Sequence, residues 1–259
     1  MTRANVLLSG PSPVSASAVE SAARTFELDV RCQPVGAALQ VSVQGALVRV
    51  TPMPGPVANA EADTSAFLSL SAANGRWRLG SHAAHLSLSL EGAVQTRASG
   101  MLSRLSGATR EATPIERLAL FTRVVAAVTK AAGGVGVHWI DGPVTHAPDF
   151  FAQLAVESPL PLPLWVGVSL TPEAGERSGV HSFGMQQLGL PDLFLLGPGG
   201  DELPDTIDFF FSALATVAER GTAPVDGETI ARSLLSRPRV QYGPSPVDPA
   251  VRVWRLDVD

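Results

Sequence analysis

The sequence predicts an α+β protein in which mostly antiparallel sheets pack against helices. Hydrophobic residues make up 45% of the 259 residues and charged residues only 17%, so the chain can bury a sizeable core. Segments that alternate apolar and polar residues, the pattern of half-buried strands, follow one another with short turns between them. Strands outnumber the helical connections that a parallel sheet would require, which favours hairpins and antiparallel pairing.

The first hundred residues begin with a short apolar strand at 6–9 and a helix that Ser15 or Ser17 caps and that reaches about Phe26. Gln44-Gly45 lies between two alternating runs and predicts a hairpin turn. The other elements expected here are strands at 30–35, 39–43, 46–53 and 85–90, and a helix at 59–73. Together they resemble the β-α-β-β-α-β order of a ferredoxin-like sandwich. Residues 91–112 are small and polar, which indicates a linker or loop.

The strongest local signals belong to a helix over residues 113–132. Thr113 and Glu116 have the spacing of a capping box, and Pro114 occupies the first helical position. The apolar stripe along the helix is wide, which indicates burial on more than one side. Gly133-Gly134 ends the helix, because glycine readily adopts the backbone conformation of a C-cap.

The rest of the chain predicts further short strands and two helices. The expected elements are strands at 135–140, 164–170, 180–185, 193–196, 229–235, 240–242 and 251–258, a hairpin tip at 173–179, and helices at 147–156 and 205–220. We therefore expect two α+β halves, 1–110 and 111–259, that share a core. A fusion of two ferredoxin-like halves fits this order, although no sequence repeat supports a duplication.

Several motifs are similar to those of a known bacterial family. The chain resembles the domain-of-unknown-function family 4261 over nearly its whole length, through the motifs VLLS, TPIERLALFTRVVAAV, GVHWIDGPVTHAPDFF and RVQYGPSPVDP followed by VWRL. That family has no established activity, so the resemblance implies a fold and a shared surface rather than a reaction. It also implies a loose association with bacterial toxin or secretion systems.

Composition argues against several classes of function. The net charge of −5 disfavours nucleic-acid binding, which usually needs a basic face. Cys32 is the single cysteine, which excludes an internal disulfide and a multi-cysteine metal site. The apolar runs are shorter than the roughly 18 residues of a membrane span, so we expect no membrane insertion and a cytoplasmic protein. No cofactor and no metal is predicted.

Histidines and carboxylates gather in the segment 138–149. His138, Asp141, His146 and Asp149 could together bind a metal ion or perform acid–base chemistry. Their spacing, H-x₂-D-x₄-H-x₂-D, matches no established metal motif. The structural alternative is that Asp149 stabilises the first turn of a helix and that His146 hydrogen-bonds to backbone around a turn.

Two aromatic residues complete the candidate site. Tyr242, in the motif YGPSP, could lie beside the turn of His146 and form a shallow pocket with Trp139. The alternative is that both rings fill the core. His82 and His85 are three residues apart, but His85 begins a predicted strand, which disfavours a metal role. The candidate binding residues are thus Trp139, Asp141, His146, Asp149 and Tyr242, and no catalytic residue is predicted.

Three functions fit these observations. The favoured hypothesis is a non-enzymatic protein-interaction module, such as an adaptor, a chaperone-like partner or an immunity-type inhibitor, whose partner is another protein. The first alternative is a small-molecule- or metal-binding enzyme with its site at the 138–149 turn. The second is a structural component of a larger assembly.

Overall fold

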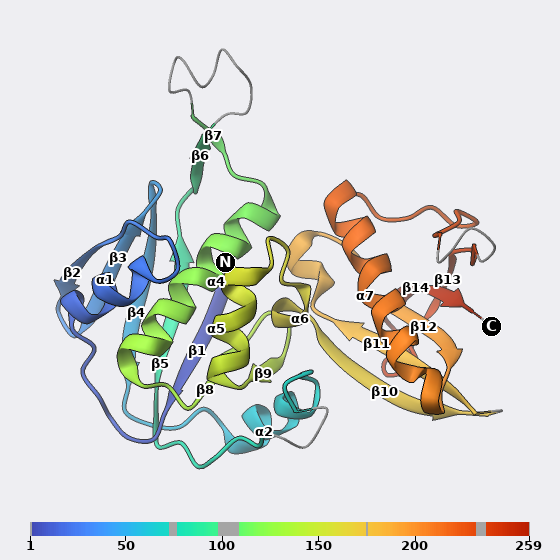
Figure 1. Cartoon of the computed structure of the whole chain (residues 1–259), viewed down its shortest axis with the longest axis horizontal. Coiled ribbons are helices and arrows are strands. Elements are labelled where there is room, and N and C mark those ends of the chain that lie inside the picture. The colour runs from blue at the N-terminus through green and yellow to red at the C-terminus, as the bar shows by residue number, and fades with distance from the viewer. Residues whose placement is uncertain (1, 73–76, 98–108, 175, 232–236, 259) are drawn as a thin grey trace. The chain divides into compact units, whose positions relative to one another are not determined.

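The structure is a computed structural model that describes residues 2–72, 77–97, 109–174, 176–231 and 237–258 (Figure 1). The chain forms two compact units, Met1–Leu164 and Trp165–Asp259, and each is described by itself. The predicted boundary at residue 110 therefore differs from the observed one. The reason is that the helices and strands between residues 114 and 157 complete the sheet and the helical layer of the first unit.

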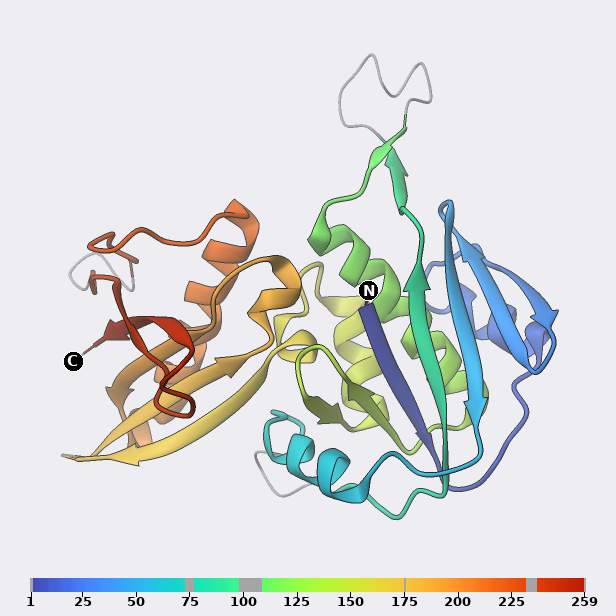
Figure 2. The same cartoon turned by 180° about the vertical axis from the view of Figure 1, so that it is seen from behind.

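The first unit is built on a seven-stranded sheet in which every pair of neighbours is antiparallel. The N-terminal strand lies between β5 and β8 (Figure 2), and its last five residues are buried. In order across the sheet the strands are β2 (Arg31–Val35), β3 (Ala38–Val43), β4 (Ala46–Met53), β5 (Ala84–Glu91), β1 (Thr2–Leu8), β8 (Gly136–Trp139) and β9 (Val144–His146).

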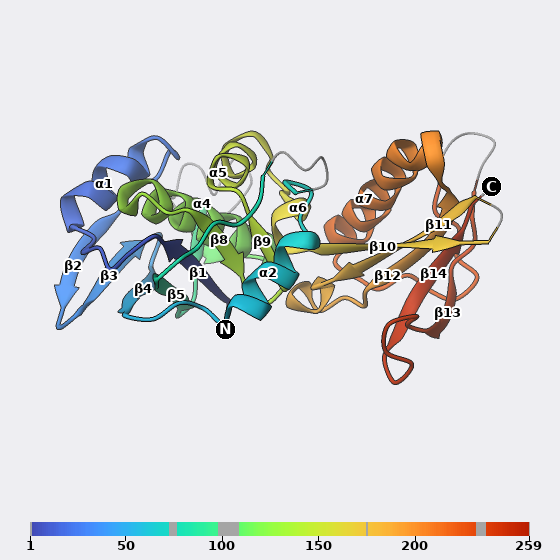
Figure 3. The same ribbon diagram turned by 90° about the horizontal axis from the view of Figure 1, so that it is seen from below.

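One face of this sheet is covered by α1 (Ala16–Arg24), α4 (Pro114–Ala132) and α5 (Pro148–Glu157), whereas α2 (Asn59–Phe67) lies on the other face, near β1, β8 and β9 (Figure 3). The side chains of β1 show the division. A Cβ atom on Gly134, directly after α4, would lie 2.8 Å from Val6, so Val6 faces that helix. Its neighbour Leu7 packs instead with Val57, which precedes α2, and with Ala62 within that helix. Alternation along β1 thus sends successive residues into two separate apolar layers.

The signals at the ends of α4 are confirmed. Thr113 Oγ1 accepts a hydrogen bond from the Glu116 amide at 3.3 Å, and the Glu116 carboxylate accepts one from the Thr113 amide at 2.8 Å. At the other end Gly133 adopts a left-handed conformation with φ of 62°. The Ser15 cap of α1 and the hairpin turn at Gln44-Gly45, where both residues have positive φ, are confirmed as well.

Some predicted elements of the first unit differ from those observed. Helix α2 ends at Phe67, whereas the predicted helix extended to residue 73, which lies outside the described part. Part of the predicted linker forms a small hairpin of β6 (Gln95–Arg97) and β7 (Thr109–Glu111), and residues 98–108 between them lie outside the described part.

The sheet order does not confirm a ferredoxin-like arrangement. In a ferredoxin-like sandwich one strand lies between the two strands that the first helix connects. Here α1 connects β1 to β2, and three strands, β3, β4 and β5, lie between them. Successive hairpins extend the sheet on one side of β1, and β8 and β9 extend it on the other. The broader α+β class, with antiparallel sheets packed against helices, is confirmed.

The second unit has a five-stranded sheet beside one long helix. Its strand order is β10 (Gly167–Glu173), β11 (Arg177–Phe183), β12 (Leu193–Pro198), β14 (Arg252–Asp257) and β13 (Gln241–Pro244). The pair β12 and β14 is parallel and the other pairs are antiparallel. A parallel pair needs a crossover, and α7 (Leu203–Arg220) lies in that connection. Its short helical turns are η1 (Met185–Leu188) and η2 (Gly200–Glu202), whereas the turn α6 (Leu162–Trp165) has its first three residues in the first unit.

Two predicted strands of this unit are shorter than expected. The strand predicted from residue 164 begins at Gly167, because Leu162–Trp165 forms the helical turn α6. Thr229 makes only an isolated bridge with Arg239, and residues 232–235 of that predicted strand lie outside the described part. Among the described residues no helix is both long enough and apolar enough to cross a membrane.

Candidate functional site

Trp139 belongs to the core of the first unit. Its ring is fully buried and contacts Phe121 of α4 and Phe151 of α5, with ring centroids 5.4 Å and 6.2 Å apart. Such tilted aromatic pairs stabilise a core beyond the area that they bury. The position of Trp139 therefore agrees with the core alternative.

The two predicted carboxylates have different surroundings. Asp141 follows β8 and accepts a hydrogen bond from the Arg3 amide at 3.0 Å, while the Arg3 guanidinium lies 3.6 Å away. It thus ties the turn to the start of β1. Asp149 is exposed in the first turn of α5, where a carboxylate interacts favourably with the helix dipole. Asp149 also lines a hollow of about 350 Å³ beside Lys130, at the end of α4.

His146 is fully buried and both of its ring nitrogens have partners. The Leu164 carbonyl, 3.1 Å from Nε2, can only accept, so Nε2 carries the proton. Nδ1 then accepts the hydrogen of Ser69 Oγ at 2.7 Å. Burial lowers the pKa of His146 to about 3, so the ring is neutral at physiological pH. A neutral imidazole with both nitrogens occupied has no free lone pair for a metal ion.

Tyr242 belongs to the second unit, whereas Trp139 and His146 belong to the first. Within its own unit the Tyr242 hydroxyl donates to the Pro224 carbonyl at 2.9 Å, and Arg252 lies over the ring, 5.7 Å from its centroid. Trp139 and His146 are brought together, since both rings contact Phe151. The shallow pocket predicted from Tyr242 with these two residues stays a prediction.

The histidines of the first unit converge on one segment. We call residues 55–71, which contain α2 and the residues around it, the α2 segment. Each of the four described histidines of this unit hydrogen-bonds to it: His85 to the Gly55 carbonyl at 2.8 Å, His82 to the Val57 carbonyl at 3.1 Å, His138 to the Glu61 carboxylate at 3.3 Å and His146 to Ser69 Oγ at 2.7 Å. The chain spacing of these histidines could not show this, because their partners are up to 77 residues away.

His138 lies at the centre of this group. Its ring is buried, with Nδ1 2.9 Å from Thr145 Oγ1 and Nε2 facing Glu61. Burial lowers the pKa of His138, the Glu61 carboxylate opposes that effect, and the nearby rings of His82 and His85 add to it. No group of three or more histidine, cysteine or acidic side chains among the described residues has the arrangement of a metal site. The histidines instead attach the α2 segment to the sheet.

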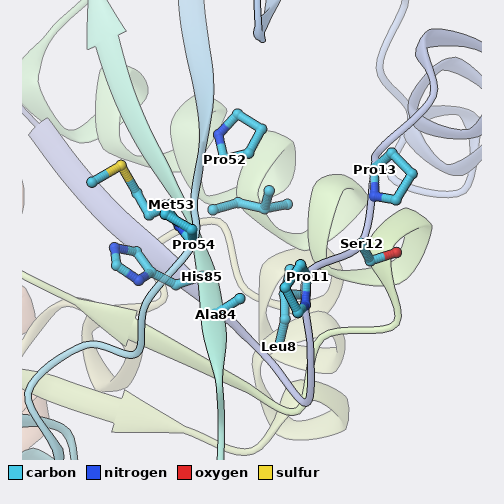
Figure 4. Close-up of a pocket in the computed structure, with 10 residues that line it drawn as sticks. Leu8, Pro11, Ser12, Pro13, Pro52, Met53, Pro54, Ala84 and His85 are labelled. Atoms are coloured by element: carbon cyan, nitrogen blue, oxygen red, sulfur yellow. The ribbon is translucent and has the colours of Figure 1, made fainter.

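An apolar pocket of about 300 Å³ lies at one end of the sheet, where β1, β4 and β5 meet the loop after β1 (Figure 4). Proline rings form much of its wall: Pro11 and Pro13 come from the loop, and Pro52 and Pro54 come from the end of β4. Met53 is 40% exposed beside them. The other lining residues are Leu8, Ser12, Ala84, His85 and Leu86.

The second unit holds a histidine–serine pair that resembles a nucleophile and its base. Ser245 Oγ lies 3.0 Å from His181 Nε2, but Ser245 is buried and also accepts from the amides of Val247 and Asp248. Asp192, whose pKa burial raises, accepts from Ser182 and from the Met185 amide. In the described part of the chain no group hydrogen-bonds to His181 Nδ1, where a catalytic triad has its third member, and the buried Ser245 is not accessible to a substrate. Ser245 therefore anchors the loop that follows β13.

Searches with protein-family models, with curated proteins and with solved structures found no match to the chain. The resemblance to the domain-of-unknown-function family 4261 accordingly stays a prediction. Neither the proline-walled pocket nor the attachment of the α2 segment was predicted. Pro11 and Pro13 are about 40 residues away from Pro52 and Pro54 in the sequence, and their proximity depends on the pairing of β4 with β5 and of β5 with β1.

Proposed function

We propose that the protein is a non-enzymatic interaction module, in the manner of an adaptor, a chaperone-like partner or an immunity-type inhibitor, and that its proline-walled pocket binds an apolar side chain of a partner protein. The pocket is the observation that carries this proposal. Its lining is apolar apart from Ser12 and His85, and it contains no carboxylate, lysine or arginine. The pocket can therefore bind a partner through shape complementarity and apolar contact rather than through ion pairs.

The size and stiffness of the pocket support a side chain as the occupant. A volume of about 300 Å³ is at the lower end of the range for pockets that hold drug-sized ligands, roughly 300–1,000 Å³. Proline rings have little freedom to lose when a partner binds, which reduces the entropic cost of association. A large aromatic or aliphatic side chain of a peptide, such as tryptophan or leucine, matches these properties.

The state of the histidines agrees with a non-enzymatic role. A general base must reach its substrate, whereas His146 and His138 are buried at 0% and 1% exposure and are hydrogen-bonded within the protein. The alternative of an enzyme at the 138–149 turn would need these rings to be accessible. A role as a component of a larger assembly predicts a defined oligomer on a sizing column.

The pocket can be tested with small probes. N-acetyl-tryptophanamide is titrated into protein labelled at the methionine methyl groups, and N-acetyl-glycinamide serves as the control. We expect a saturable shift of the Met53 methyl signal with the tryptophan probe alone, because Met53 lines the pocket. No shift at millimolar probe, or equal shifts with both probes, would contradict the proposal.

A pair of variants extends the test to protein partners. Met53→Asp places a charge in the pocket, and Val35→Asp places the same charge on β2 at a comparably exposed position, 46% against 40%. We expect a protein captured from native lysate by the wild type to be retained by Val35→Asp and lost by Met53→Asp. Equal capture by both variants would remove the pocket from the interaction.

A further inference from the structure

The α2 segment has little apolar attachment to the first unit. The described apolar side chains of α2 that are buried are the small ones of Ala62 and Ala66, whereas Phe67 is 84% exposed. The N-cap residue Ala58 makes no side-chain cap. By contrast, α4 buries ten residues, Val124 and Phe121 among them. Elements with few buried apolar contacts open at a lower free energy than the rest of a domain.

Polar bonds to histidines therefore carry much of the attachment, and their donors can be assigned. The carbonyls of Gly55 and Val57 only accept, so the bonded nitrogens of His85 and His82 carry protons. His138 likewise donates to the Glu61 carboxylate. In these three bonds the ring nitrogen is the donor, so none of them uses a lone pair of the ring. His146 differs, because its Nδ1 accepts from Ser69 and would have to be protonated inside the core.

The groups that surround His146 cannot compensate a positive charge. The α5 helix presents the rings of Phe150 and Phe151, 5.8 Å and 5.9 Å away, and β8 presents His138, whose charge would repel it. The α2 segment presents Ser69, and α6 presents the Leu164 carbonyl. His138 in turn faces Glu61, His82 and His85.

We propose that the α2 segment is an acid-opened flap, which detaches from β8 and β9 when His146 beneath it takes up a proton and can no longer accept the hydrogen bond of Ser69. Opening gives His146 water in place of Ser69, and it uncovers the apolar contact of Leu7 with Val57 and Ala62. Opening of the flap requires no ligand, so this proposal does not depend on whether the proline-walled pocket binds a partner.

The size of the response follows from His146. If its pKa returns from about 3 to the ordinary 6.5 in the open form, the ratio of open to closed molecules rises about 30-fold between pH 7.5 and pH 5. His138, whose pKa is also lowered by burial, adds to this response. The open form stays a minor species unless the flap is weakly held at neutral pH.

Hydrogen exchange with mass spectrometry tests the flap on the whole protein. After correction for the intrinsic effect of pH, we expect the opening constant for amides 61–69 to rise about 30-fold from pH 7.5 to pH 5, while β4 and β5 stay protected. His146→Asn keeps a hydrogen-bond acceptor for Ser69 but cannot titrate, so its rise is far smaller. His181→Asn, which removes a buried histidine of the second unit, leaves the rise unchanged.

Two outcomes overturn the proposal. One is a uniform change across the α2 segment, β4 and β5, which shows loss of the whole unit rather than a flap. The other is a rise in His146→Asn equal to that of the wild type. If His146→Asn fails to fold, Ser69→Ala replaces it: loss of the Ser69 bond opens the segment at pH 7.5, and unchanged protection there counts against the flap as well.

Discussion

We expect acid to destabilise the first unit, because His146 is buried there as a neutral ring. The pKa of His146 is lowered from 6.5 to about 3 in the folded protein, chiefly by burial. The unfolded chain therefore binds more protons than the folded one below pH 6.5. The stability that the neutral ring contributes is fully present above that pH and is lost as the pH falls from 6.5 towards 3.

The change in unfolding free energy follows from the difference between the pKa of His146 in the folded and in the unfolded chain. Each pKa unit corresponds to about 1.4 kcal/mol, so the complete effect approaches about 5 kcal/mol at very low pH. Between pH 8 and pH 5, only the part between 6.5 and 5 is expressed, which amounts to about 2 kcal/mol of unfolding free energy. This is a large fraction of the stability of a typical domain, roughly 5–15 kcal/mol.

Urea denaturation at pH 8, 6.5 and 5 measures this loss, with tryptophan fluorescence reporting on the core around Trp139. His146→Asn should reduce the difference between pH 8 and pH 5 by about 2 kcal/mol relative to the wild type. Phe121→Leu is the matched control, since it weakens the same core without removing an ionisable group or the Trp139 reporter, and it should keep the full pH dependence. An unchanged pH dependence in His146→Asn would refute the argument.

A substitution and a chemical reaction test two local features. Gly134→Ala should lower the free energy of unfolding, measured by urea denaturation, by about 1–3 kcal/mol, because its Cβ would lie 2.8 Å from Val6 and 2.9 Å from Thr129. The control Gly10→Ala should be neutral, because its Cβ would meet no atom within 4 Å. Equal effects of the two variants would contradict the packing of α4 on β1. Burial and the nearby Glu20 raise the pKa of Cys32 to about 11. Cys32 should therefore react with iodoacetamide at pH 8 about 100-fold more slowly than a thiol with the ordinary pKa of 9.0. Reaction at the rate of a free thiol would show that the strand edge opens.

Local signals in the sequence predicted much of the secondary structure. The capping box of α4 depends on Thr113 and Glu116, three residues apart, and the turn of the β3–β4 hairpin depends on Gln44-Gly45. Interactions between near neighbours determine these features, so the spacing of residues is sufficient evidence. The α+β class follows from the same kind of information, because alternation and hairpin turns are local as well.

The candidate site was less predictable because its contacts join distant segments. The cluster of polar residues at 138–149 suggested an exposed site, yet every residue of β8 and β9 is buried, Trp139 and His146 among them. Asp141 binds the Arg3 amide, a partner 138 residues away. No pattern within twelve residues could distinguish such structural roles from a binding site.

The stretch from Thr113 to Phe151 shows both kinds of information. Its helix α4 is determined by its own sequence, since caps and apolar periodicity act over one or two turns. The role of the histidines beyond it was decided by the tertiary structure, which places the α2 segment over β8 and β9. The physical reason is burial: whether an imidazole is a ligand, a base or an anchor depends on the dielectric and the partners around it, and the fold supplies both.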